Sequence, residues 1–102
     1  MKKTFLLLIA LVLLLSACAG PAPIEKARQK AVSIGEQFLN YELTAAEAKE
    51  QLDSIMVPET EGNGQLFLKK DIAYLSFIIG KRGSTYEEIA DKVEFIRTRT
   101  YE

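Results

Sequence analysis

Few side chains in this 102-residue chain are suited to chemistry. The chain has one cysteine, Cys18, and no histidine. The lack of histidine excludes Ser-His-Asp and Cys-His catalysis and removes the commonest metal ligand. Carboxylates, lysines, tyrosines and serines remain, but they form no motif typical of a catalytic or metal site. We therefore predict a protein without enzymatic activity, metal or cofactor, in which Cys18 is the residue with a specific chemical role.

Cys18 follows a segment with the features of an export signal. Lys2 and Lys3 precede an unbroken apolar run over residues 5–15, and small residues come next. The last four residues of the segment resemble the lipobox of bacterial lipoproteins: Leu15, Ser16, Ala17 and Cys18. In that family the thiol carries a lipid, and signal peptidase II cuts before the cysteine. The resemblance covers residues 1–18.

This resemblance has consequences for domain organisation and location. It implies that residues 1–17 are a cleaved signal peptide and that lipidated Cys18 anchors the chain to the membrane. The folded part would then lie in the cell envelope, on the extracytoplasmic side. Residues 18–23 would form a short tether, which places the domain at most about 20 Å from the anchor.

The alternative is an uncleaved transmembrane anchor, because residues 4–24 carry no charge. A span needs about 20 apolar residues. The strongly apolar part covers only residues 5–15, and Pro21 and Pro23 would interrupt a helix near its end. The sequence therefore favours the cleaved lipoprotein.

The chain from Cys18 onward is small and mildly acidic. It carries 11 basic and 14 acidic residues, a net charge of −3. Its length allows one small domain over residues 24–102. Proteins that bind nucleic acid are usually basic, so we expect no nucleic-acid partner.

One short motif points the other way. The loop 80–83, Gly-Lys-Arg-Gly, has apolar residues on both sides and resembles the Gly-x-x-Gly loop of KH domains. That loop joins two helices and clamps a nucleic-acid backbone. A KH domain also needs a three-stranded sheet, and only 19 residues follow Gly83. We therefore interpret the glycines as the end of one helix, with Ser84 as the cap of the next.

The basic residues near this loop also have two interpretations. Lys81 and Arg82, together with Lys69 and Lys70, could contact lipid phosphates. Alternatively, Lys81 and Arg82 complement the dipole at the end of a helix. The acidic balance of the domain favours the second interpretation.

Helical periodicity dominates the chain after the tether. It predicts amphipathic helices over residues 24–41, from Thr44 to about Pro58, over 65–80 and over 85–97. Thr44-x-x-Glu47 and Ser84-x-x-Glu87 fit the capping-box pattern at two of the starts. Short connections favour antiparallel pairing. We predict an all-α fold of about four helices in two antiparallel hairpins, joined by the polar loop 58–64 and followed by a frayed tail.

The predicted helix 65–80 is apolar on nearly all sides, more than one core requires. Its surplus apolar residues are candidate contacts for a protein partner or for self-association: Phe67, Tyr74, Phe77 and Ile78. The function that the sequence favours is a non-enzymatic interaction or structural module at the membrane surface. The alternative is a module that binds a small ligand or lipid, which would need an apolar cavity between the hairpins. An enzyme using carboxylates would need two of them in one cleft.

Overall fold

The computed structural model describes residues 22–59 and 62–101, so the predicted signal peptide, the lipobox and Cys18 lie outside the described residues. The described residues form α2 (Pro23–Leu39), α3 (Ala45–Asp53), α4 (Gly64–Gly80) and α5 (Tyr86–Thr98). They include no strand. The predicted all-α fold is confirmed.

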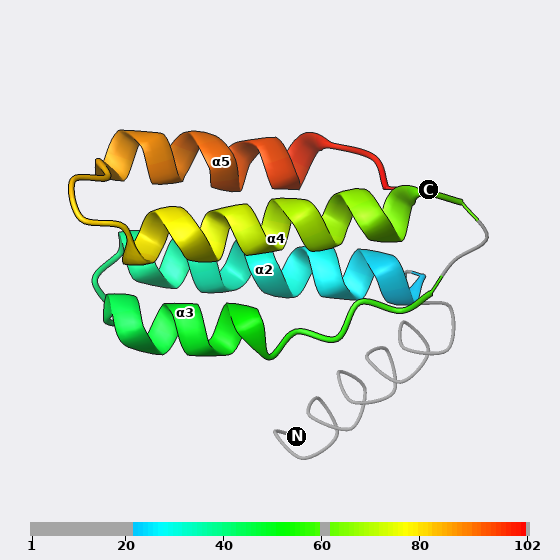
Figure 1. The fold of residues 1–102 in the computed structure, drawn as a ribbon, viewed down its shortest axis with the longest axis horizontal. Helices are drawn as coiled ribbons and strands as arrows, with labels where there is room; N and C mark the ends of the chain where they lie inside the picture. Colours follow the sequence, from blue (N-terminus) through cyan, green and yellow to red (C-terminus); the bar gives the residue numbers. More distant parts are fainter. Residues whose placement is uncertain (1–21, 60–61, 102) are drawn as a thin grey trace, which may run out of the picture.

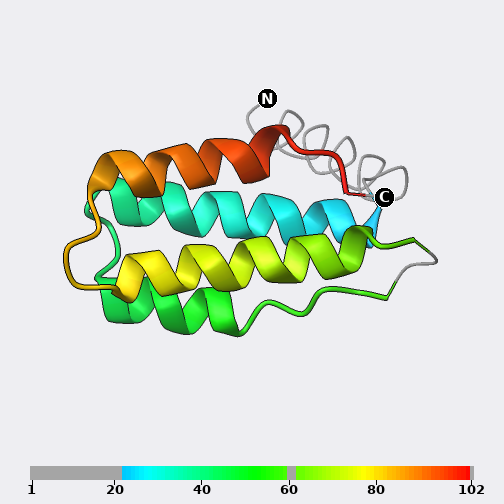
Figure 2. The same cartoon turned by 45° about the horizontal axis from the view of Figure 1, so that its top comes forward.

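The four helices lie side by side and alternate in direction (Figures 1 and 2). The turn between α2 and α3 and the loop between α4 and α5 are at one end. The starts of α2 and α4 and the C-terminal tail are at the other end. The two predicted hairpins pack together, with α2 against α5 and α3 against α4. The result is an up-down-up-down bundle in which every helix has antiparallel neighbours.

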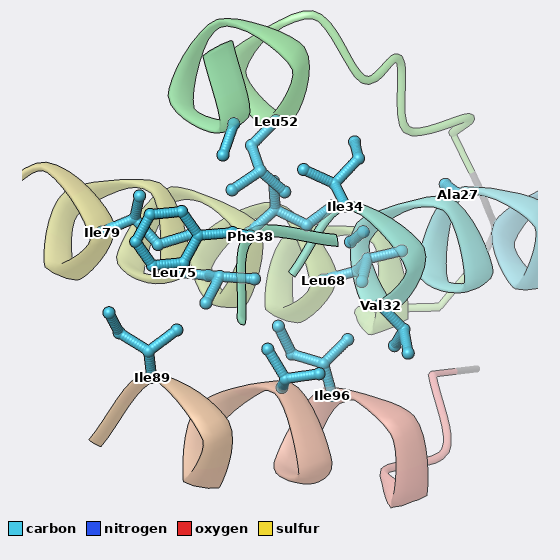
Figure 3. Packing of buried hydrophobic residues seen from close by; sticks show 14 of the residues in the cluster. Ala27, Val32, Ile34, Phe38, Leu52, Leu68, Leu75, Ile79, Ile89 and Ile96 are labelled. Atoms are coloured by element: carbon cyan, nitrogen blue, oxygen red, sulfur yellow. The ribbon is translucent and has the colours of Figure 1, made fainter. Parts of the chain in front are cut away.

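All four helices contribute to one apolar core, with Leu52, Leu75 and Ile96 among its fully buried side chains. Figure 3 shows how side chains from facing helices meet in the space between the ribbons. Burial of one large aliphatic side chain contributes roughly 1.5–3 kcal/mol. The periodic apolar residues of the sequence therefore provide the main stabilisation of the bundle.

The starts of α3 and α5 differ in how well the sequence predicts them. The capping box at Thr44 is confirmed: its hydroxyl accepts from the Glu47 N–H at 3.1 Å, and the Glu47 carboxylate accepts from the Thr44 N–H at 3.0 Å. The bond from the Thr44 N–H lowers the pKa of the Glu47 carboxyl, because it favours the charged carboxylate. At α5 the predicted cap, Ser84, is wrong by one residue. Thr85 caps the helix instead, accepting from the Glu88 N–H at 3.1 Å.

α2 ends at Leu39, before the predicted boundary, in a turn that contains no glycine. Tyr41 takes the left-handed conformation with φ 64°. The Glu42 N–H donates to the Gln37 carbonyl at 2.8 Å, which closes a Schellman motif. A left-handed conformation costs a non-glycine residue about 1–2 kcal/mol. Contact between the rings of Tyr41 and Tyr86, with centroids 5.4 Å apart, opposes this cost.

α3 also ends earlier than predicted, at Asp53 rather than near Pro58. The residue before a proline avoids helical conformation, which favours an early end. The chain then continues without helix, and Ile55 and Val57 pack against the core. Met56, in the same non-helical segment, is 90% exposed.

Gly35 allows α2 and α5 to approach closely. A Cβ atom built on Gly35 would lie 2.4 Å from Cγ2 of Val93 and 3.6 Å from Leu75. The first distance is shorter than a carbon–carbon contact permits, and Val93 is buried. Any larger residue at position 35 must therefore push α5 away from α2.

We predict that Gly35→Ala destabilises the protein by about 1–3 kcal/mol, because an added methyl overpacks this contact. In a Val93→Ala background the clash is absent, and alanine is the better helix former by roughly 1 kcal/mol. There the same substitution should be neutral or stabilising. Denaturant unfolding of the four chains measures the difference. An equal cost of Gly35→Ala in both backgrounds would contradict this view of the helix contact.

Candidate interaction surface on α4 and α5

Three of the four predicted contact residues lie on the outside of the bundle. Phe67, Tyr74 and Phe77 are 43%, 48% and 58% exposed. The prediction for Ile78 is wrong, since this side chain is 1% exposed and belongs to the core. It follows Leu75 by three residues and therefore lies on the stripe of α4 that faces the other helices.

The bundle adds a fourth ring that the sequence did not single out. Phe95 of α5 is 45% exposed, and Lys92 links it to α4: the ammonium group lies 4.4 Å from the Phe95 ring centroid and 5.1 Å from that of Tyr74. We call the set Phe67, Tyr74, Phe77 and Phe95 the aromatic surface.

A buried carboxylate organises the boundary between α4 and α5. Asp71 is 7% exposed, although its neighbours on the same stripe of α4 are apolar. It accepts from Nζ of Lys92 at 2.9 Å, from Nη1 of Arg99 at 3.4 Å and from the hydroxyl of Tyr101. A buried charge without partners would be strongly destabilising, so these three donors are a requirement of the fold.

The same cations bind the aromatic rings. The Arg99 guanidinium carbon lies 4.8 Å from the Phe67 ring centroid, 5.4 Å from that of Phe95 and 5.5 Å from that of Tyr101. A cation over a ring contributes about 0.5–1 kcal/mol at an exposed position. Asp71 thus fixes the cations, and the cations fix the rings of the aromatic surface.

The C-terminal tail is ordered by this network, contrary to the predicted frayed end. Tyr101 is 3% exposed and joins the core. Burial raises the pKa of the Tyr101 hydroxyl above its ordinary value, and its hydrogen bond to Asp71 raises it further. The sequence contains one indication that the tail is ordered, which is Asp71. A charged residue within an apolar stripe requires a partner from another element.

α3 is fixed to α4 by a second polar contact. The hydroxyl of Ser76, which is 1% exposed, donates to Asp53 at 2.7 Å and accepts from Lys49 at 3.3 Å. Lys49 and Asp53 also form a salt bridge. The two buried polar residues of α4 therefore have separate tasks: Asp71 positions α5 and the tail, and Ser76 positions α3.

The network around Asp71 is suited to holding the fold rather than to catalysis. Three donors from α5 and the tail already surround the carboxylate. In the described part of the chain, no three Asp or Glu residues gather as metal ligands would. A surface depression between α2 and α3 is polar; it is lined by Lys30, Glu47, Glu50, Gln51 and Ser54.

The Gly-x-x-Gly loop is a connection between two helices of the bundle. Gly80 is the last residue of α4, and Gly83 has φ +92°, a conformation that favours glycine. No strand occurs within residues 22–59 and 62–101, whereas a KH domain packs a sheet against these helices. The similarity to KH domains is therefore confined to the loop.

Fold and surface together define the class: a small four-helix bundle with an exposed aromatic surface along α4 and α5. No protein-family model matches the chain, and no curated protein or solved structure shows significant similarity to it. Among the helices described, none combines the length and apolar character needed to cross a membrane.

We predict that Tyr101→Phe destabilises the protein by about 1.5–3 kcal/mol at neutral pH, because Asp71 loses a buried donor. The raised pKa of Tyr101 also sets a pH dependence. The contribution of the Tyr101 hydroxyl to the free energy of unfolding is fully present below about pH 10, the pKa of an unfolded tyrosine. It is lost as the pH rises further, because the unfolded chain then loses this proton more readily than the folded chain does.

Unfolding measured from neutral to strongly alkaline pH tests both effects. The difference in stability between the native chain and Tyr101→Phe should shrink above about pH 10. Tyr74→Phe is the control, because the Tyr74 ring is 48% exposed. A pH-independent difference for Tyr101→Phe would contradict the proposed burial of this hydroxyl.

Proposed function

We propose that this protein is a lipid-anchored, non-enzymatic interaction module of the cell envelope. Cys18 carries the anchor, and the aromatic surface makes contact at the membrane surface. The observation that carries the proposal is the exposure of four aromatic rings on a bundle whose core is complete without them. The lipobox resemblance of residues 15–18 supports the anchored location.

The character of the surface supports a binding role. Exposed apolar side chains that form a continuous patch usually mark an interaction site. Rings held by cations keep fixed positions, so little conformational freedom is lost when they are covered. A protein partner or a second copy of the chain remains the partner predicted from the sequence.

The alternative, a small-ligand or lipid-binding module, requires an apolar cavity between the hairpins. The space between the helices holds the side chains of the core (Figure 3), and the depression between α2 and α3 is polar. A second depression, between α3 and α4, is lined mainly by apolar residues: Leu52, Ile55, Val57, Ile72 and Ala73, with Asp53 and Lys69. It is open to the surface and is not an enclosed cavity between the hairpins, so the interaction module is the better supported proposal.

The anchor has a direct test. Cys18→Ser should abolish incorporation of a labelled fatty acid and move the protein from the membrane fraction to the soluble fraction, because the hydroxyl cannot replace the thiol in lipidation. Ala19→Ser, one residue further on, is the matched control and should remain labelled. Unchanged labelling and fractionation of Cys18→Ser would refute the anchor.

The contact surface can be tested by photo-crosslinking in intact cells. A photoreactive phenylalanine at position 77 should form adducts with a membrane component, because this side chain is 58% exposed on the aromatic surface. The same group at position 46, an exposed residue of α3, should form few. Equal adduct yields at the two positions would contradict the assignment of the surface.

A further inference from the structure

The exposed charges of the bundle are segregated by helix. Between Gly62 and Gly83, Asp71 is the sole acidic residue, and it is buried among its three donors. The other charged residues of this segment are exposed and basic: Lys69, Lys70, Lys81 and Arg82. The outward face of α4 therefore combines exposed rings with positive charge and presents no carboxylate.

The neighbouring helices α3 and α5 carry an excess of exposed carboxylates, with Lys49 and Arg97 as their exposed basic residues. On α3 and in the segment after it, four carboxylates are exposed: Glu47, Glu50, Asp53 and Glu59. Four more are exposed on α5: Glu87, Glu88, Asp91 and Glu94. Lys69 and Lys70 form no salt bridge with these residues or with any other described residue. Two acidic flanks thus border one basic, aromatic face.

We propose that the outward face of α4 lies directly on the anionic phospholipid headgroups of the membrane. The proposal rests on the proposed function, because it names the partner of the aromatic surface on an anchored module. The lysines would contact lipid phosphates, and Leu66, Phe67 and Phe77 would enter the boundary between headgroups and acyl chains. This combination of basic and bulky apolar side chains is typical of helices that lie in the membrane interface.

Charge complementarity favours lipid over the other partners. Each Lys or Arg near an anionic bilayer increases binding about fivefold. Isologous pairing would bring two copies of the same basic face together, since each copy presents Lys69 and Lys70 and no carboxylate between Gly62 and Gly83 other than the buried Asp71. The acidic flanks on α3 and α5 would be repelled by the headgroups. α2 also carries exposed basic residues, Lys26 and Lys30, but none of its large apolar side chains is exposed, so α4 is the helix that combines positive charge with exposed rings.

The geometry is compatible with an anchor at Cys18. Five residues from Cys18 to Ala22 reach at most about 20 Å, close to the thickness of two helices. α2 and α4 begin at the same end of the bundle (Figures 1 and 2), so the tether starts near the beginning of the proposed face. α4 is about 25 Å long and would lie parallel to the membrane.

A single tryptophan tests this contact, because the chain contains none. The lipidated full-length chain carrying Phe77→Trp would be incorporated into vesicles of phosphatidylcholine alone or mixed with phosphatidylglycerol. We expect a blue-shifted emission and quenching by lipids with brominated acyl chains in the anionic vesicles only. High salt should reverse both, because it screens the attraction. Met56→Trp, at a position 90% exposed in the segment after α3 and outside the proposed face, should show neither change.

Charge reversal supplies a matched pair of variants. Lys69→Glu with Lys70→Glu is introduced into the Phe77→Trp chain. The ratio of chains whose α4 face contacts the membrane to chains whose α4 face is free should then fall at least about tenfold. Lys26→Glu with Lys30→Glu changes the net charge equally on exposed positions of α2 and should leave that ratio nearly unchanged. Circular dichroism verifies that both variants remain helical.

Three results would overturn the proposal: emission at position 77 equal to that at position 56, equal quenching in neutral and anionic vesicles, or a blue shift without quenching by brominated lipids. The last result would assign the face to a second copy of the chain, the one other protein surface present in the vesicles. Flotation of both tryptophan chains with neutral vesicles reports the anchor independently. A failed anchor and a failed contact are therefore distinguishable.

Discussion

The buried carboxylate of Asp71 is the constraint on which the outer half of the bundle depends. A charge on an apolar stripe of α4 needs hydrogen-bond donors. Lys92 of α5 donates to Asp71, and so do Arg99 and Tyr101, which follow the end of α5. α5 therefore packs in one position along α4, and the last residues of the chain lie against the bundle. Hydrophobic burial alone would tolerate several positions, because apolar contact is not directional.

The two buried polar residues of α4 contact different neighbours in the bundle. Ser76 is matched by Asp53 and Lys49 on one side, and Asp71 is matched on the other. A third connection joins α2 to the end of α5, where Arg28 donates to the Arg97 carbonyl at 2.7 Å. These directional contacts, together with the close approach at Gly35, select one arrangement of the four helices. The core supplies the larger part of the free energy.

The arrangement around Asp71 also explains why exposed rings persist on α4. Lys92 and Arg99 lie over the rings of Tyr74, Phe95 and Phe67, so part of each ring's surface is covered by a cation that the carboxylate already holds. Phe77 lies beyond that network, with Lys81 6.0 Å from its ring centroid. The surface is therefore ordered near α5 and open toward the loop, where Lys81 and Arg82 lie.

The sequence by itself determined the number of helices, their pairing into two hairpins, the cap at Thr44 and the exposure of Phe67, Tyr74 and Phe77, because these follow from apolar periodicity and local hydrogen bonds. It also carries the lipobox pattern around Cys18, which lies outside the described residues. The cap at Thr85 and the early end of α3 are local features that apolar periodicity does not place accurately. The tertiary structure decided the burial of Ile78 and the docking of Tyr101. These depend on which helix faces which, and only contacts between residues distant in the chain, such as those of Asp71 with the tail, fix that choice.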